Sequence, residues 1–206
     1  NKLPQIITAM REQIKSCGGE IHFETKLTNL TLEKEQIHSV ELNHHTHVKA
    51  EAVILATGHS ARDVFELLHQ NKIYIEAKPF ALGVRVEHPQ TLIDSIQYHC
   101  SVRDSNLPPA SYSLVEQVKG KGLFSFCMCP GGIIAPASTA NGELVVNGWS
   151  PSKRDNPFAN SGMVVSVEEK DAAHYFKSQN TKNKNQNLEN HPLLMMYFQK
   201  AIEEKA

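Results

Sequence analysis

An apolar run that stops abruptly constrains the fold of this chain more than any other feature. Residues 52–58 read Ala-Val-Ile-Leu-Ala-Thr-Gly, and His59-Ser-Ala-Arg62 follows. The run predicts a buried β-strand, and the small and polar residues after it predict a turn that opens a helix. A strand, a tight turn and a helix start bring the backbone close to a flat, phosphate-bearing cofactor.

The glycine-rich phosphate loop that normally accompanies such a strand is missing from the sequence. No G-x-G-x-x-G occurs in the 206 residues, and the nearest candidate, Gly120-Lys-Gly122, has Ser125 where the third glycine belongs. The pattern therefore predicts only half of a dinucleotide site.

Composition narrows the class of protein. The 206 residues fit one large domain or two small ones, and 40% hydrophobic residues are enough for a core. A formal net charge of −1 with mixed signs gives no electrostatic case for nucleic acid or acidic membranes. No stretch approaches the ~18–20 apolar residues that span a bilayer, and no secretory leader opens the chain. Four cysteines in a chain of this length indicate reduced thiols and a cytoplasmic location.

The first 78 residues predict a partial α/β unit that contains a small antiparallel ribbon. Apolar spacing, Pro4 near the start and Gly18-Gly19 at the end favour an amino-terminal helix. Ser60 and Asp63 form a capping-box pattern for a second helix. The predicted elements are a helix over 3–17, strands over 20–24, 27–32, 37–42 and 52–57, and a helix that begins at 60.

Residues 79–206 predict a mostly antiparallel β domain with flanking helices, so the fold class is α+β. Strand 80–86 alternates apolar residues with small or cationic ones, and the segments around Lys119-Gly-Lys-Gly122 read as a hairpin. Residues 178–190 are rich in Asn and predict a mobile surface loop, after which Asn190 caps a last helix. The other predicted elements are strands over 143–148 and 163–167 and helices over 91–98 and 168–176.

Several motifs, taken in order, resemble one family. They are Gly18-Gly-Glu-Ile-His-Phe-Glu-Thr-Lys-Leu27, the run at 52–62, Lys78-Pro-Phe-Ala-Leu-Gly-Val-Arg-Val-Glu-His-Pro89, Phe126-Cys-Met-Cys-Pro-Gly-Gly132, and Asn147-Gly-Trp-Ser150 through Arg154-Asp155 and Asn160. They resemble an uncharacterised family of FAD-dependent dehydrogenases in the two-dinucleotide-fold flavoprotein class. The resemblance implies FAD and a small-molecule substrate.

The resemblance covers most of the chain. The family's amino-terminal glycine-rich unit and the closing segment that completes the flavin site have no counterpart here. The chain also begins at Asn1 without a Met and stops inside an apparent helix. We therefore expect the central part of a longer protein, with residues 1–78 as the remainder of a FAD-binding domain and 79–206 as a substrate domain.

The family's cofactor contacts map onto five positions. Leu27 resembles the strand end whose backbone meets the adenine edge, although an ordinary strand pair explains it too. Thr57 and Gly58 resemble the second turn near the flavin, where a missing Cβ permits close approach, and a glycine after any buried strand does the same. His59 and Arg62 lie at a helix start, which suits either an anion or a solvated cap.

Five further positions are candidates on the substrate side. Arg85 suits a bound carboxylate or phosphate, or a salt bridge with Glu87 or Asp94. Strand alternation places the sulfurs of Cys127 and Cys129 on one face, and packing against the core, a redox role and partial metal ligation all remain open. The turn at Gly131 and Gly132 could approach a ligand. No catalytic residue and no metal site are assigned.

Two functional classes follow for the chain. The first is the central part of a FAD-dependent oxidoreductase, inactive in isolation, in which the flavin performs the redox step. The alternative is a non-catalytic binding or assembly domain on an α/β scaffold. A weaker third option is a thiol- or metal-dependent protein centred on the two cysteines.

Overall fold

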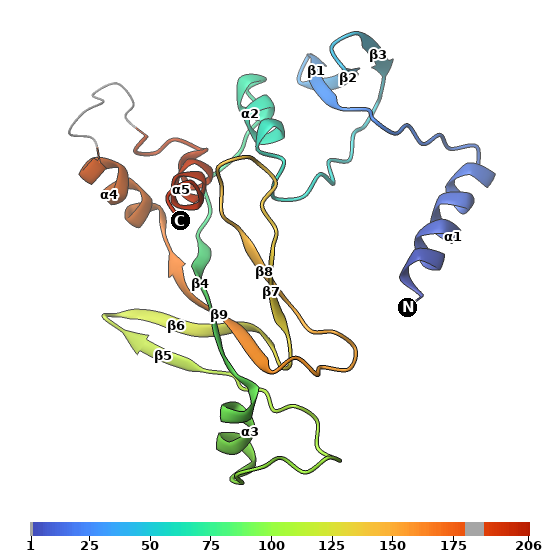
Figure 1. The fold of residues 1–206 in the computed structure, drawn as a ribbon. Helices are drawn as coiled ribbons and strands as arrows, with labels where there is room; N and C mark the ends of the chain where they lie inside the picture. Colours follow the sequence, from blue (N-terminus) through green and yellow to red (C-terminus); the bar gives the residue numbers. More distant parts are fainter. Residues whose placement is uncertain (1, 180–187) are drawn as a thin grey trace. The chain divides into compact units, whose positions relative to one another are not determined.

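The computed structural model describes residues 2–179 and 188–206, and it divides into two compact units, Asn1–Ile73 and Tyr74–Ala206 (Figure 1). Helices and antiparallel sheets make up the chain, and most of the strands lie in the second unit. This confirms the predicted α+β class.

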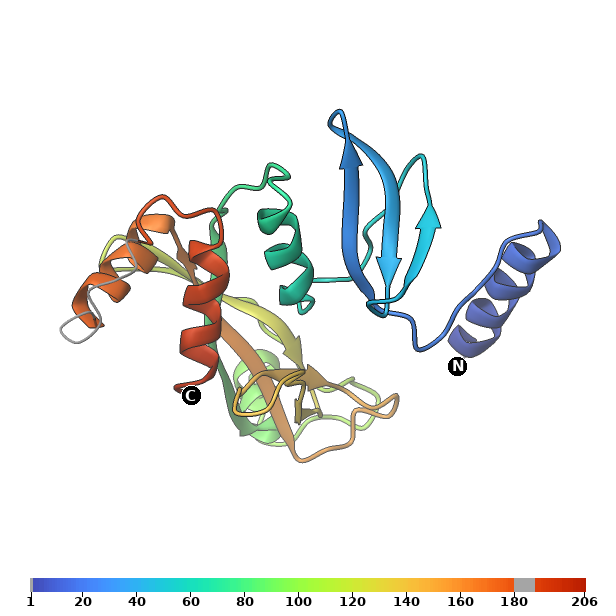
Figure 2. The same ribbon diagram turned by 90° about the horizontal axis from the view of Figure 1, so that it is seen from above.

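The first unit is built around a three-stranded antiparallel sheet in the order β1-β2-β3, which Figure 2 shows in blue to cyan. Leu30 on β1 pairs with Val40 on β2; Leu30 is buried and Val40 is half-buried. The elements of this unit are α1 (Leu3–Ser16), β1 (Leu27–Glu33), β2 (Gln36–Leu42), β3 (Thr46–Lys49) and α2 (Arg62–Gln70).

Helix α2 is tied to strand β1 at both of its ends. Lys26 Nζ lies 2.6 Å from Asp63 Oδ2 at the start of the helix. At the other end Asn71 Nδ2 donates to Asn29 Oδ1 at 3.2 Å. Val64 is the buried residue of the helix. These links hold the first turn of α2 next to the first residue of β1.

Helix α1 confirms the prediction of an amino-terminal helix but buries none of its side chains. Proline occupies its first turn, where the missing N–H costs nothing, and Gly18 follows its end with a φ of +84°. Its apolar residues are exposed: Leu3, Ile6, Ile7, Met10 and Ile14.

The predicted strand at 52–57 is wrong for this chain. These residues have no regular secondary structure, and the side chain of Ile54 is 92% exposed. A strand needs a neighbour for its backbone N–H and C=O groups, and among the described residues β3 ends the sheet without pairing to this run. The predicted strand at 20–24 is also irregular, with Glu24 in a left-handed conformation.

The predicted capping box at the start of α2 does not form. The N-cap residue is Ala61, and no side chain caps the helix there. The Asp63 carboxylate accepts instead from Val64 N at 3.1 Å and pairs with Lys26. The helix itself is confirmed, with its first residue at Arg62.

The second unit is organised around a four-stranded antiparallel sheet in the order β4-β9-β6-β5, with a separate hairpin of β7 and β8 (Figure 1). The hairpin of β5 and β6 confirms the prediction around Lys119-Gly-Lys-Gly122. The strands are β4 (Phe80–Pro89), β5 (Val115–Val118), β6 (Lys121–Cys129), β7 (Ile133–Pro136), β8 (Val146–Trp149) and β9 (Phe158–Val167). The helices are α3 (Gln90–Tyr98), α4 (Glu169–Gln179) and α5 (Leu194–Glu203).

Strand β9 is the centre of this sheet. It pairs with β4 along its whole length, from Phe80 opposite Val167 to Pro89 opposite Phe158. Its other edge pairs with β6, and a register shift interrupts that ladder between Phe126 and Cys129. Within β9, Ala159, Asn160 and Ser161 are completely buried.

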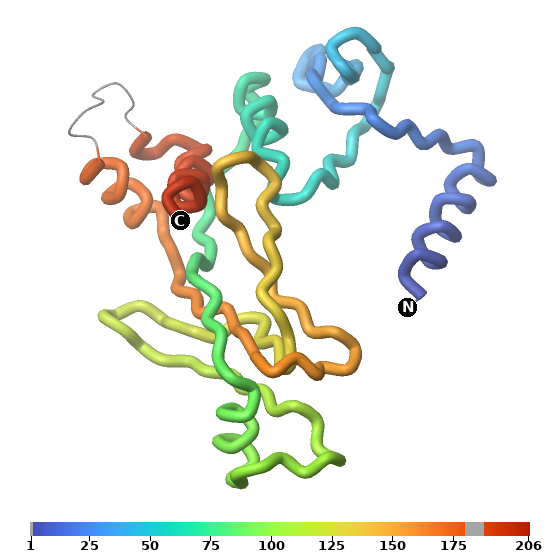
Figure 3. Tube along the Cα trace, in the orientation of Figure 1, coloured from blue at the N-terminus to red at the C-terminus, as the bar shows by residue number. Residues whose placement is uncertain are grey.

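The hydrophobic core of the second unit lies where α4 and α5 meet the sheet. Its buried members are Val167, Ala172, Leu194, Met195 and Phe198. The Phe198 ring lies edge-on to Tyr175 at 5.3 Å between centroids. Figure 3 follows the long loop from β7 to β8 up to the end of α5, where Leu144 N donates to Glu203 O at 2.8 Å.

The sequence does not predict strand β7, a four-residue strand between a turn and a polar loop. One prediction for the second unit needs correction. Helix α5 follows Leu193, which offers no side-chain cap, so Asn190 is not its N-cap. Most of the predicted loop at 178–190 lies outside the described residues, because 180–187 are not described.

We expect Leu194→Ala to destabilise the second unit by about 2–5 kcal/mol, because the change removes buried methyl groups and leaves a cavity in the core. Leu194 is 2% exposed, whereas Leu92 on α3 is 50% exposed and offers a matched control. Urea unfolding, followed by fluorescence of the single tryptophan, Trp149, measures both. Equal losses from Leu194→Ala and Leu92→Ala would contradict the assigned core.

Candidate functional site

A polar cluster, here called the Arg85 cluster, lies where β4, β6, β8 and β9 meet. Its members are Arg85, Cys127, Cys129, Gly148 and Asn160. Arg85 Nη1 donates to Asn160 Oδ1 and, at 3.9 Å, to Cys129 Sγ. Arg85 Nη2 donates to the carbonyl oxygen of Cys127 at 3.0 Å. The structure thus brings together three residues that the sequence placed on the substrate side.

The guanidinium of Arg85 occupies space that a glycine leaves open. A Cβ built on Gly148 of β8 would overlap Nη1 and Cζ of Arg85 and lie 2.6 Å from Asn160 Oδ1. Strand β8 can therefore pass the cluster only because residue 148 has no side chain. Asp94, one of the acidic partners considered for Arg85, pairs with Arg103 instead.

The side-chain amide of Asn160 has a buried donor without a hydrogen-bond partner among the described residues. Its side chain is 0% exposed, and the unpaired donor is Nδ2. A guanidinium can only donate, so Arg85 fixes the amide with Oδ1 toward itself and Nδ2 facing away. A buried unpaired donor costs free energy, which makes Asn160 an unusual feature of this cluster.

The two cysteines of β6 have different surroundings. Cys127 has a φ of +48° at the register shift and is exposed, whereas Cys129 is buried. Cys129 Sγ donates to the Cys127 carbonyl oxygen at 3.3 Å. Burial, with a smaller contribution from Cys127, raises the pKa of the Cys129 thiol, although Arg85 opposes this. Only Cys129 is therefore a core residue, and it stays protonated at neutral pH.

The turn after β6 is buried by the chain itself. Gly131 has a φ of +49°, which favours glycine, and a Cβ there would overlap the carbonyl oxygen of Arg154. A Cβ on Gly132 would lie 2.6 Å from the carbonyl oxygen of Trp149. These atoms fill the space beside both glycines. Contact of this turn with a ligand stays a prediction.

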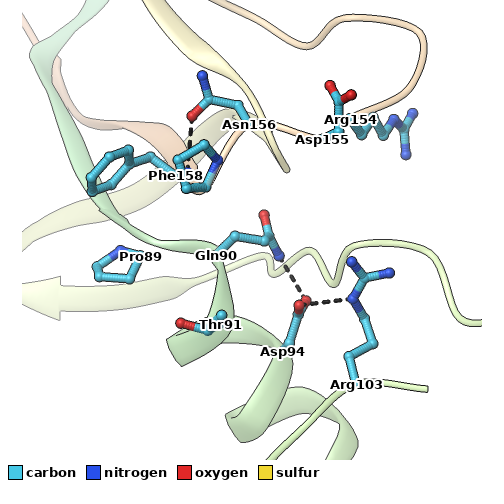
Figure 4. A pocket seen from close by; sticks show the side chains of 10 residues that line it. Pro89, Gln90, Thr91, Asp94, Arg103, Arg154, Asp155, Asn156 and Phe158 are labelled. Carbon is cyan, nitrogen blue, oxygen red and sulfur yellow. Dashed lines mark hydrogen bonds and ion pairs between the residues drawn. The ribbon is translucent and has the colours of Figure 1, made fainter. Parts of the chain in front are cut away.

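A cavity of about 420 Å³, here called the α3 pocket, lies beside the start of α3 (Figure 4). Its polar lining includes Gln90, Asp94 and Arg103 on one wall and Arg154 and Asp155 on the other. Gln90 Oε1 accepts from Gly131 N at 2.7 Å, so the pocket wall is bonded to the buried turn.

Asp94 organises one wall of the α3 pocket. Its Oδ1 accepts from Gln90 Nε2 and Ala110 N, each at 2.8 Å, and its Oδ2 accepts from Arg103 Nε at 2.8 Å. Burial alone would raise the pKa of this carboxyl, but the bonds from Ala110, Gln90 and Arg103 together lower it. Asp94 is therefore a buried, fully bonded carboxylate.

In the first unit, the candidate cofactor residues lie near one another. Leu27 is the first residue of β1 and pairs with Leu42, and Arg62 is the first residue of α2. The ion pair between Lys26 and Asp63 holds the first residue of β1 next to the first turn of α2. The Lys26 hydrogen bond lowers the pKa of Asp63 despite some burial. A carboxylate thus already occupies the first turn of α2, where the sequence suggested an anion.

Thr57, Gly58 and His59 form an exposed turn ahead of α2. Gly58 has a φ of +77°, and no heavy atom lies within 4 Å of the place where its Cβ would be. The left-handed backbone suits a glycine, and the space beside it is open. The structure thus leaves this turn approachable; contact with a cofactor stays a prediction.

Sequence reasoning missed four of the residues that build these sites. Asn160, Gln90 and Arg103 are ordinary polar residues whose partners are distant in sequence, so no local signal identifies them. Gly148 did carry a signal, since a glycine inside a strand pattern marks close approach of another group. Among the described residues, no group of three or more His, Cys, Asp or Glu side chains could hold a metal ion.

Comparison with known proteins identifies the family. The chain belongs to the family described as "FAD-dependent protein, C-terminal domain-like", whose model matches residues 79–206. The matched segment contains the Arg85 cluster, the buried turn and the α3 pocket.

A curated relative extends the likeness into the first unit. An uncharacterised protein of Clostridium beijerinckii is 41% identical over 171 residues, which cover 82% of this chain and 32% of the relative. The chain therefore spans about a third of the relative's length. In the described part of the chain, no helix is both long and apolar enough to cross a membrane.

We expect Gly148→Ala to destabilise the second unit by about 1–3 kcal/mol, because the new methyl group must displace the Arg85 guanidinium. Gly122→Ala is the control, since a Cβ there meets only Gln117 Nε2, at 3.7 Å. Its effect should stay within about 1 kcal/mol. Urea unfolding measures both, and equal effects would show that Arg85 is not confined by β8.

We expect Asp94→Asn to lower stability at neutral pH by about 1.5–3 kcal/mol, because the amide cannot accept from all three donors. The folded-state pKa of Asp94 is lowered, so its contribution is present above the unfolded-state pKa and is lost as pH falls through the folded-state pKa. The difference between wild type and Asp94→Asn should shrink in acid. Asp155→Asn, at the exposed wall of the pocket, is the matched control and should change the free energy of unfolding by less than about 0.5 kcal/mol.

Proposed function

We propose that this chain is the central part of a longer FAD-dependent oxidoreductase that acts on a small-molecule substrate in the cytoplasm. Residues 1–78 would complete its FAD-binding domain, and 79–206 would form its substrate domain. The observation that carries the proposal is the match of residues 79–206 to an FAD-dependent family. In such an enzyme the bound flavin supplies the redox chemistry.

The first unit fits the flat part of a dinucleotide rather than its phosphates. The turn at Gly58 is open on one side, and the apolar side chain of Ile54 just before it is exposed. These features suit a ring system lying against the backbone. We assign this contact to Thr57, Gly58 and His59, with Leu27 and Arg62 beside them. No glycine-rich loop in the sequence would bind the pyrophosphate.

On the substrate side, the Arg85 cluster supplies a fixed positive charge next to two thiols. Two nitrogens of Arg85 are already committed to Asn160 and Cys127. We therefore assign Arg85 an electrostatic and positioning role, in which it stabilises negative charge close to the end of β6. Cys127, Cys129, Gly131 and Gly132 shape that surface.

The 206-residue chain alone should be colourless after purification and should not quench flavin fluorescence when FAD is added. The physical reason is that backbone amides of a glycine-rich loop normally provide most of the binding to the phosphates. Visible absorbance spectra and a fluorescence titration measure this. Stoichiometric flavin in the isolated chain would contradict the assignment of these residues as an incomplete site.

Expressed within its longer protein, the same sequence should purify with bound FAD. There Arg62→Ala should weaken FAD binding roughly tenfold, the effect of losing one hydrogen bond from the guanidinium to an acceptor atom on a ring of the cofactor. Arg11→Ala, an exposed arginine on α1 in the same unit, is the matched control and should bind FAD normally. A longer protein that binds no FAD would favour the alternative, a non-catalytic binding or assembly domain.

A further inference from the structure

The bulge in β6 presents one thiol to solvent. Regular strand geometry ends at Phe126, and the ladder to β9 resumes at Cys129. Between them Cys127 has a left-handed φ of +48°, a conformation that side chains other than glycine seldom adopt. The result is an exposed Cys127 beside a buried Cys129.

The Cys129 thiol contacts the backbone of Cys127 and the guanidinium of Arg85. Cys129 Sγ lies 3.3 Å from the Cys127 carbonyl oxygen and 3.9 Å from Arg85 Nη1. The Cys127 side chain also contributes to the raised pKa of the Cys129 thiol. Arg85 is itself anchored by Asn160 and by the Cys127 carbonyl oxygen. The Cys129 sulfur therefore lies against the backbone of Cys127, and the two cysteines differ in their access to solvent.

We propose that Cys127 and Cys129 are a peroxide-sensitive dithiol, in which exposed Cys127 is oxidised first and buried Cys129 then closes an intramolecular disulfide. The inference is independent of the proposed flavin function. It rests on the bulge, on the contrast in exposure and on the contact of the Cys129 sulfur with the Cys127 carbonyl oxygen.

The chemistry balances with a hydroperoxide as the oxidant. The Cys127 sulfur attacks one peroxide oxygen, the O–O bond breaks, and sulfenic acid and water (or an alcohol) form. The Cys129 sulfur then attacks the Cys127 sulfur, the S–O bond breaks, and water leaves as the disulfide forms. Two thiols lose two electrons and two protons, and hydrogen peroxide becomes two waters.

The order of the two oxidations follows from access and protonation. Cys127 is exposed, so peroxide reaches it without any opening of the fold. Cys129 is only 6% exposed, so peroxide has little access to it. The raised pKa of Cys129 keeps that thiol protonated and slow to react with peroxide. Cys129 must give up its contacts with the Cys127 carbonyl oxygen and Arg85 to form the new bond. Oxidation should therefore loosen the Arg85 cluster.

The other two cysteines provide an internal comparison. Cys17 is exposed like Cys127, but its contact is with Gln13 Nε2, at 3.4 Å, rather than with a second cysteine. Cys100 is half-buried in the loop after α3. A variant with both replaced by serine keeps only the proposed pair, and one with Cys127→Ser and Cys129→Ser keeps only the other two.

The test treats both variants of the full chain with a small excess of hydrogen peroxide, blocks free thiols with N-ethylmaleimide and measures intact mass. The variant that keeps the pair should lose two hydrogens and both free thiols within one molecule, and dithiothreitol should restore them. The variant with Cys17 and Cys100 should retain its thiols or gain oxygen, without that intramolecular loss.

Two single changes in the background without Cys17 and Cys100 test the order. Cys129→Ser should leave a Cys127 sulfenic acid that dimedone traps, whereas Cys127→Ser should leave Cys129 unoxidised and unalkylated in the folded chain. The proposal is overturned if peroxide forms no disulfide between the two cysteines, or if Cys129 is oxidised as fast without Cys127 as with it. Circular dichroism spectra matching the wild type show that the variants are folded.

Discussion

The hydrogen bond from Arg85 to Asn160 is the interaction on which the arrangement of the second unit's site depends. It joins β4 to β9 inside the sheet, between residues 75 positions apart in the sequence. Arg85 is half-buried, and the fold supplies its guanidinium with an amide oxygen and a backbone carbonyl as acceptors. Because the guanidinium needs room, β8 must cross at Gly148. The side chain of Arg85 therefore limits which residue of β8 can lie beside β4 and β9.

Much of the second unit's fold could be predicted from the sequence because its signals are local. Alternation along residues 80–86 predicts β4, and helical spacing predicts α3 and α4. The run at 52–57 shows the limit of the same reasoning. Its apolar residues indicate side chains that favour burial. A β-strand, however, also needs a second strand to pair with its backbone, and no described strand pairs with residues 52–57.

The site was less predictable because it depends on register. The sequence predicts that Arg85 is a cation on the small-residue face of β4. It does not predict that Asn160 lies within hydrogen-bonding distance of Arg85. That contact follows from the β4–β9 pairing, which sets Glu87 opposite Asn160 and Arg85 opposite Gly162. The separate environments of Cys127 and Cys129 likewise depend on a bulge, and one inserted residue changes the face of every side chain after it.

The buried turn after β6 links the two polar regions of the second unit. Cys129 ends the strand in the Arg85 cluster, and Gly131 N donates to Gln90 Oε1 at the α3 pocket. Gln90 in turn donates to Asp94, so continuous hydrogen bonding runs from the pocket wall to the turn. Protein interiors are densely packed, so a displacement at one end has little free space to absorb it. A change in the position of Cys129 must therefore be accommodated by the turn or passed on to the start of α3.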